Sequence, residues 1–177
     1  MLNPPYATNG VAVAPHALAA QSALAVLREG GNAIEAMVAA AATIAVVYPH
    51  MNSIGGDGFW LILPPGAPPI GIDACGRSGS LATIEFYRER GCSTIPTRGP
   101  LAANTVAGTL SGWMEALSVS QRLGGRMPLR RLLADAIGYA QDGIPVTRSQ
   151  HASTQAKWAE LKDQPGFGRC YLVDGAA

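Results

Sequence analysis

The residues that could do chemistry begin in a glycine loop. Gly55, Gly56, Asp57 and Gly58 form the run GGDG, directly before the apolar segment FWLIL. Successive glycine N–H groups can bind an anion, but the known nucleotide-binding patterns need a Lys-Ser/Thr pair after the glycines, or a strand before them and a helix after. Here the predicted order is helix, glycines, strand. We therefore interpret the loop as closely packed backbone beside a site, with Asp57 as a turn-forming residue.

Arg77 and Cys75, in the segment DACGRSG, are the candidates for contact with a substrate. An arginine just past a strand end, among small residues, is well placed to bind a carboxylate bidentately; the alternative is a surface arginine in a flexible loop. A nucleophilic cysteine needs a positioned base, and none of His16, His50 and His151 has a distinctive spacing to Cys75. A small buried thiol is the commoner role for a cysteine.

The other polar residues form no further site. Asp73, Glu85 and Glu89 make no pair whose closeness the sequence can establish, and His50 after Pro49 is expected to be structural. No hydrolytic triad, zinc spacing or phosphoryl-transfer set is present. We therefore expect no metal, no cofactor and no catalytic residue within this chain.

Composition excludes several partners. The 177 residues are 48% hydrophobic and 14% charged, with a net charge of +1 and no basic run. Neither nucleic acid nor an acidic membrane is favoured by such a charge. The three cysteines are widely spaced, which favours a reduced, cytoplasmic protein; no signal peptide is visible, although a trimmed N-terminus would allow a periplasmic location. The longest apolar tract, residues 36–48, is too short to span a membrane.

Helical spacing predicts about five helices and one hairpin. One helix, with Pro15 in its first turn, ends at Gly30-Gly31, and a second opens at Asn32 with Glu35 completing a capping box. Because this second helix has no polar face, we expect it to be enclosed between a sheet and another layer. A short helix is predicted at 83–91, and longer helices around 113–123, 129–140 and 148–161.

The predicted hairpin pairs residues 59–63 with 70–73 through the loop PPGAPP. Continuous apolar residues predict that both of its faces are covered, and two strands do not complete a sheet. A further strand is predicted to begin at YLVDGAA. Residues 1–177 are therefore expected to form a single incomplete domain whose remaining strands lie elsewhere.

Two long blocks resemble the gamma-glutamyltranspeptidase family. They are HALAAQSALAVLREGGNAIEAMVAAAATIAVVYPHMNSIGGDGFWLIL and NTVAGTLSGWMEALSVSQRLGGRMPLRRLLADAIGYAQDGIPV, and together they cover residues 10 to about 150. The resemblance implies an N-terminal-nucleophile hydrolase: an α+β fold, an αββα sandwich, made as a precursor that cuts itself into two subunits. It also implies a threonine nucleophile at the new N-terminus of the small subunit, acting through an acyl-enzyme.

Two departures from the family pattern matter. The chain resembles only the first part of the large subunit, so Thr105 and Thr109 are not the nucleophile and the chain alone is predicted to be inactive. The family's D-x-R-E motif, whose arginine holds the substrate's α-carboxylate, is replaced by DACGR, so Cys75 occupies the place of that arginine and Arg77 follows two residues later. Asp57 likewise replaces a glycine of the family's GGGGF. The sequence is thus closer to the branch that contains oxamate amidohydrolase and some acylases.

The resemblance therefore predicts a large-subunit segment of an amidohydrolase that cleaves a small gamma-glutamyl or related amide. Its expected partners are the small subunit or the remainder of the precursor, and a second copy of the complete heterodimer. Arg77 and Cys75 are the predicted substrate-binding residues, with Gly55 to Gly58 as a structural loop beside them. The alternative is a non-catalytic scaffold or interaction domain derived from the family.

Overall fold

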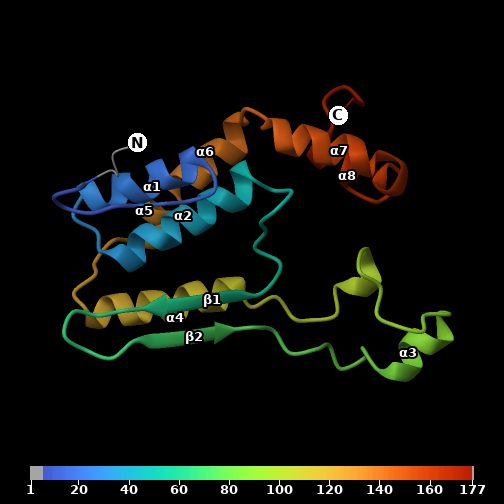
Figure 1. The fold of residues 1–177 in the computed structure, drawn as a ribbon, viewed down its shortest axis with the longest axis horizontal. Helices are drawn as coiled ribbons and strands as arrows, with labels where there is room; N and C mark the ends of the chain where they lie inside the picture. Colours follow the sequence, from blue (N-terminus) through green and yellow to red (C-terminus); the bar gives the residue numbers. More distant parts are fainter. Residues whose placement is uncertain (1–5, 177) are drawn as a thin grey trace. The chain divides into compact units, whose positions relative to one another are not determined.

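The computed structural model describes residues 6–176. The chain divides into two compact units, shown in Figure 1: unit 1 comprises Met1–Ser53 and Met127–Ala177, and unit 2 comprises Ile54–Arg126. The single incomplete domain stays a prediction. Within residues 6–176, no helix has both the length and the apolar character that a bilayer crossing needs.

Unit 1 begins with two helices that end as the sequence predicts. Helix α1 (Ala17–Arg28) starts two residues after Pro15, which was expected in its first turn, because His16 is the N-cap; His16 Nδ1 accepts from Leu18 N at 3.2 Å. Gly30, with φ 90°, follows its end. Helix α2 (Ala33–Val47) opens with the predicted capping box, in which Asn32 Oδ1 accepts from Glu35 N at 3.0 Å and Glu35 Oε2 accepts from Asn32 N at 2.8 Å.

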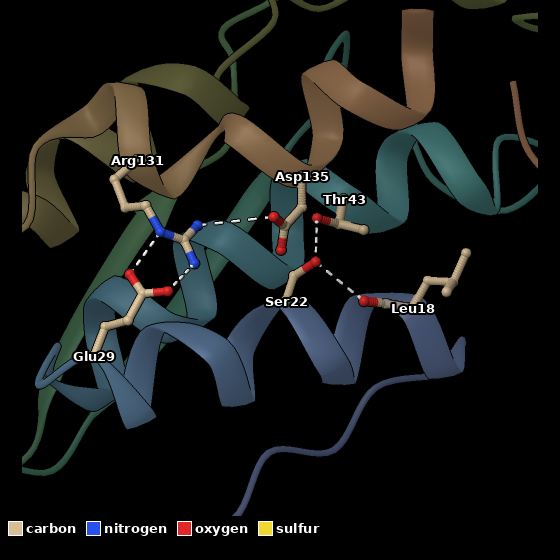
Figure 2. A network of polar contacts seen from close by, with 6 residues as sticks. All are labelled: Leu18, Ser22, Glu29, Thr43, Arg131 and Asp135. Atoms are coloured by element: carbon tan, nitrogen blue, oxygen red, sulfur yellow. Dashed lines mark hydrogen bonds and ion pairs between the residues drawn. The ribbon is translucent and has the colours of Figure 1, made fainter. Parts of the chain in front are cut away.

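The contact between α1 and α2 forms the core of unit 1. Small residues on both helices allow close approach, and the fully buried side chains include Val26, Val38 and Val47. One buried polar pair crosses this core: Thr43 Oγ1 donates to Ser22 Oγ at 3.0 Å, and Ser22 Oγ donates to Leu18 O at 3.1 Å (Figure 2). Helix α2 is buried on most sides, as predicted, but its neighbours within unit 1 are helices.

Two further helices pack on α2. The helix predicted around 129–140 is divided at Leu133 into α5 (Leu129–Leu132) and α6 (Ala134–Asp142). Figure 2 shows Arg131 reaching from α5 to Glu29 at the end of α1, with Nε to Oε2 at 2.6 Å. The same guanidinium lies 3.8 Å from Asp135.

The C-terminal part of unit 1 is helical. Helix α7 (Arg148–Leu161) has the predicted bounds, and α8 (Phe167–Tyr171) stacks Phe167 against Tyr171 with ring centroids 5.5 Å apart. The predicted strand start at residues 171–177 is wrong within the described residues: α8 ends there, and Val173 pairs with Ala176 in a tight turn. Residue 177 lies outside the described part.

Unit 2 is built on the predicted hairpin. Strands β1 (Gly58–Ile62) and β2 (Ile70–Ala74) are antiparallel and pair from Gly58↔Ala74 to Ile62↔Ile70. Helix α4 (Thr109–Arg122) packs against both strands (Figure 1). Within residues 6–176 only one face of the hairpin is covered, by α4, because alternate side chains of the apolar run point away from that helix; coverage of both faces stays a prediction. Phe59, Leu61 and Leu63 are 70%, 81% and 73% exposed.

The segment between the hairpin and α4 contains the short helices α3 (Ile84–Glu89) and η1 (Pro100–Ala102). Thr83 caps α3, which confirms the short helix predicted there. The buried Tyr87 donates its hydroxyl to Leu101 O at 3.0 Å and thereby ties the two helices together.

Candidate substrate-binding site

The candidate site lies in unit 2, where the ladder of the hairpin ends. The last pair is Gly58↔Ala74, so continuing the antiparallel register by one residue places Asp57 opposite Cys75. The glycine loop and the loop that carries Arg77 are thereby brought side by side. The sequence predicted these two loops as the site, but it could not show that their side chains meet.

Asp57 binds the neighbouring loop through its carboxylate. Its Oδ1 accepts from Gly76 N at 3.0 Å. The hydrogen bond from Gly76 N–H, and then the one from the Cys75 thiol, lower the pKa of Asp57 below its usual range. The charged Asp57 side chain therefore links the glycine loop to the loop that carries Arg77. This contact goes beyond the turn-forming role predicted from the sequence.

Cys75 lies between two carboxylates. Its backbone N–H donates to Asp73 Oδ1 at 2.9 Å. The hydrogen bond from its thiol to Asp57 raises the pKa of Cys75, as do partial desolvation and the charges of Asp57 and Asp73. Because the thiolate is the reactive form of cysteine, this environment disfavours Cys75 as a nucleophile. Cys75 is exposed, which corrects the buried thiol that the sequence favoured.

Arg77 is exposed in the loop that leaves β2. Its backbone carbonyl accepts from Val106 N at 2.9 Å, and the next residues continue this pairing through Ser78↔Thr105 and Gly79 N to Asn104 O at 2.9 Å. Within residues 6–176, the Arg77 guanidinium makes no hydrogen bond or ion pair. Its backbone is held and its five donors are available to a ligand.

The glycine loop is fixed to the start of α4 through one carbonyl. Gly56 O accepts from Gly108 N at 3.0 Å, from Thr109 N at 2.9 Å and from Thr109 Oγ1 at 2.7 Å. Thr109 is buried, and its hydroxyl holds this loop. Gly55 and Gly58 flank the contact without adopting a positive φ.

The residues that must be glycine lie elsewhere, and the sequence analysis missed them. A Cβ on Gly76 would lie 1.5 Å from Val106 O, one on Gly108 2.1 Å from Ala74 O, and one on Gly112 2.6 Å from Ala74 Cβ. At Gly56 nothing lies within 4 Å of such an atom. The close packing is therefore between the end of β2 and the start of α4, and the block VAGTLSG carried that signal.

The other candidate residues have structural positions. His16 caps α1, and the His50 ring lies in a T-shaped contact with the Tyr48 ring, with centroids 4.3 Å apart. His50 was expected to be a hydrogen-bonded structural histidine, but within residues 6–176 its buried Nδ1 has no hydrogen-bond partner. His151 lies in α7, and Glu85 and Glu89 lie on α3. Over residues 6–176, no group of three His, Cys, Asp or Glu side chains is arranged to hold a metal ion.

Comparison with known proteins agrees with the resemblance seen in the sequence. The gamma-glutamyltranspeptidase family profile matches residues 19–177. The oxamate amidohydrolase proenzyme of Klebsiella pneumoniae is 67% identical over 171 residues, which are 96% of this chain and 32% of that protein. The glutathione hydrolase-like YwrD proenzyme of Bacillus subtilis is 39% identical over 171 residues, or 96% of this chain and 31% of that protein.

Solved structures give the same result. The gamma-glutamyltranspeptidase of Helicobacter pylori matches with a TM-score of 0.83 at 27% identity, over 94% of this chain and 47% of that one. The enzyme from Pseudomonas nitroreducens complexed with L-DON matches with a TM-score of 0.79 at 35% identity, over 93% and 48%. The predicted fold class, α+β and part of an N-terminal-nucleophile hydrolase, is confirmed.

The chain spans about a third of the length of the curated relatives it matches, 32% and 31% for the two named above. Both relatives are proenzymes. The matches cover both units and almost all of the described residues. The chain belongs to the gamma-glutamyltranspeptidase family.

Proposed function

We propose that this chain is the N-terminal part of the large subunit of a self-cleaving amidohydrolase, and that Arg77 binds the carboxylate of a small amide substrate. The observation that carries the proposal is the free guanidinium of Arg77, two residues beyond Cys75, in a chain 67% identical to an oxamate amidohydrolase proenzyme. Oxamate has a carboxylate next to its amide. A planar guanidinium can bind such a carboxylate with two parallel hydrogen bonds.

The surroundings of Cys75 support Arg77 over Cys75 as the anion-binding group. A thiol between Asp57 and Asp73, with its pKa raised, offers no positive charge to a carboxylate. Arg77 is the nearby cation in the sequence, and its backbone is tied to Val106. Cys75 then contributes to the wall of the site and its hydrogen-bonding pattern.

The chemical step is proposed to use a threonine outside these residues. The threonine hydroxyl would attack the amide carbonyl, form an acyl-enzyme and release the amine or ammonia, and water would then hydrolyse the ester. Because the carboxylate-binding group is displaced relative to the family motif, we favour hydrolysis over transfer to an amine. The chain by itself supplies the scaffold and Arg77, and would be inactive.

The open face of the hairpin supports a partner from the same precursor. Phe59, Leu61 and Leu63 form an exposed apolar row on one face of a two-stranded sheet, and exposed rows of this kind usually mark an interface. The related proenzymes extend to about three times the length of the matching region. We infer that the remainder of the precursor, or the small subunit made from it, covers this face. The proposal keeps a cytoplasmic location, on the sequence argument of three widely spaced cysteines.

The test is Arg77→Ala in the complete, processed protein, with oxamate as the substrate. We expect the KM for oxamate to rise at least tenfold, about 1.4 kcal/mol of lost binding, and Arg77→Lys to restore part of it because the charge remains without the planar fork. Arg122→Ala is the matched control, since the exposed Arg122 guanidinium donates to Ser118 Oγ on the same helix and lies away from the candidate site. An unchanged KM in Arg77→Ala would remove Arg77 from the site.

A second measurement addresses the reaction class. Mass spectrometry of the complete protein should show two chains, the second beginning with threonine. A single uncut chain without amidase activity would instead favour the non-catalytic scaffold, for which the exposed face of the hairpin would be the interaction surface.

A further inference from the structure

Asp57 and Cys75 are the two residues at which the candidate site departs from the usual family motifs, and the structure brings them together. Asp57 and Cys75 lie opposite each other, one position beyond the last pair of the hairpin. The Asp57 carboxylate accepts hydrogen bonds from the Cys75 thiol and from Gly76 N. Two substitutions that look independent in the sequence are therefore one hydrogen-bonded unit.

This unit fixes one side of the loop that carries Arg77. On the other side, Arg77 O accepts from Val106 N at 2.9 Å and Gly79 N donates to Asn104 O at 2.9 Å, both between backbone atoms. The Gly76 N–H donates to Asp57 Oδ1 at 3.0 Å. The loop thus lies between the glycine loop and residues 104–106, and the contact on the glycine-loop side is made by a side chain.

The loop offers no replacement for that carboxylate if it is lost. Gly76 is so close to Val106 that a Cβ would lie 1.5 Å from its carbonyl oxygen. Gly76 itself has no side chain to take over the contact with the glycine loop. Its N–H would turn to water, and a glycine released from a hydrogen bond regains a wide range of backbone conformations.

We propose that Asp57 is a positioning residue for Arg77: its carboxylate, through Gly76 N and the Cys75 thiol, holds the loop so that the guanidinium meets the substrate carboxylate. Asp57 itself does not bind the substrate, since two carboxylates repel each other. The negative charge of Asp57 also repels an anion beside Cys75, so the substrate carboxylate would bind at Arg77 instead. The inference rests on the proposed role of Arg77.

The experiment compares Asp57→Asn and Asp57→Ala in the complete, processed protein with oxamate. Asn keeps an oxygen that can accept from Gly76 N, so its KM should stay within about twofold of wild type. Ala removes the acceptor, and its KM should rise about fivefold or more, the equivalent of one hydrogen bond. The kcat should change less than the KM in both variants. Glu89→Gln, an exposed carboxylate on α3 of the same unit, is the surface control.

A second readout follows the contact without catalysis. The rate of Cys75 alkylation by iodoacetamide, measured peptide by peptide as a function of pH, reports the pKa of its thiol. Because Asp57 raises that pKa, the midpoint should move to lower pH in Asp57→Ala. The midpoint for Cys170, which lies in unit 1, should not move.

The outcomes separate this inference from the proposed function. A raised KM in Arg77→Ala together with an unchanged KM and an unchanged Cys75 midpoint in Asp57→Ala would overturn the positioning role and leave the proposed function intact. A kcat that falls as much as KM rises would also overturn it, because the defect would then not be one of substrate binding. If Asp57→Ala is not processed, Asp57→Gly takes its place, because the family's GGGGF motif has glycine where this chain has Asp57.

Discussion

The Glu35 carboxylate joins two parts of unit 1 that are far apart in the chain. Its Oε2 accepts from Asn32 N at 2.8 Å, and its Oε1 accepts from Met127 N, 92 positions away, at 2.7 Å. Glu35 is only 2% exposed. One buried side chain therefore caps α2 and also fixes the point where the chain re-enters unit 1.

Replacing Glu35 with Gln should destabilise this junction. The amide has one oxygen, so one of the two N–H donors would face an NH2 group and stay unsatisfied, at a cost of about 1–3 kcal/mol. Hydrogen exchange should accelerate at Met127 and in the first turn of α2. Glu115→Gln on the exposed side of α4 is the control; equal exchange in both variants would contradict the structural role of Glu35.

The Ser22–Thr43 pair should behave as a coupled unit. Both side chains are buried, at 2% and 0% exposure, and Thr43 donates to Ser22. Ser22→Ala leaves a buried hydroxyl without this partner and should cost about 1–3 kcal/mol of unfolding free energy, whereas the double variant Ser22→Ala with Thr43→Val should cost less than the sum of the two. A double-mutant cycle from urea unfolding measures this. Strict additivity would argue against the bond.

Alanine at Gly108 should disrupt unit 2, because its Cβ would lie 2.1 Å from Ala74 O and backbone must move. We expect a loss of more than about 2 kcal/mol, in the range of severe overpacking. Gly138→Ala is the matched control: Gly138 lies within α6 with nothing within 4 Å of the added atom. It should be neutral or stabilise by up to about 1 kcal/mol. Thermal unfolding of both variants separates packing from helix propensity.

The Glu29–Arg131 pair gives a prediction for pH dependence. The hydrogen bond from Arg131 lowers the pKa of Glu29, so the contact stabilises the folded state at pH values above the unfolded pKa and is lost as pH falls through the lower folded pKa. In Arg131→Ala, the carboxyl carbon of Glu29 should titrate at a higher pH in NMR spectra than in wild type. An unchanged titration would mean that the two side chains do not pair in solution.

The elements were largely predictable because their signals are local. Asn32 with Glu35, Gly30 after α1, and Gly143 after α6 mark helix ends through chemistry that acts within one turn. The hairpin followed from two apolar runs around a proline loop. The split at Leu133 was not visible, because the apolar period continues through it.

The candidate site was only half predictable. Residue types and motif positions drew attention to Cys75, Arg77 and Asp57, but a contact between positions 57 and 75 depends on the hairpin register, which the sequence does not state. Positions 76 and 108 likewise cannot carry a Cβ atom, because the end of β2 and the start of α4 pack closely there. Such contacts are long-range, so no local pattern encodes them.

The exposed row of Phe59, Leu61 and Leu63 has a consequence for biogenesis. In a precursor as long as the related proenzymes, of which this chain spans about a third, the ribosome would complete this hairpin when most of the chain was still unmade. At about 5–20 residues per second, synthesis of that remainder takes on the order of tens of seconds. During this interval the nascent chain would expose the apolar face of the hairpin, which is prone to aggregation. We expect a chaperone that binds apolar segments to increase the yield of the mature protein.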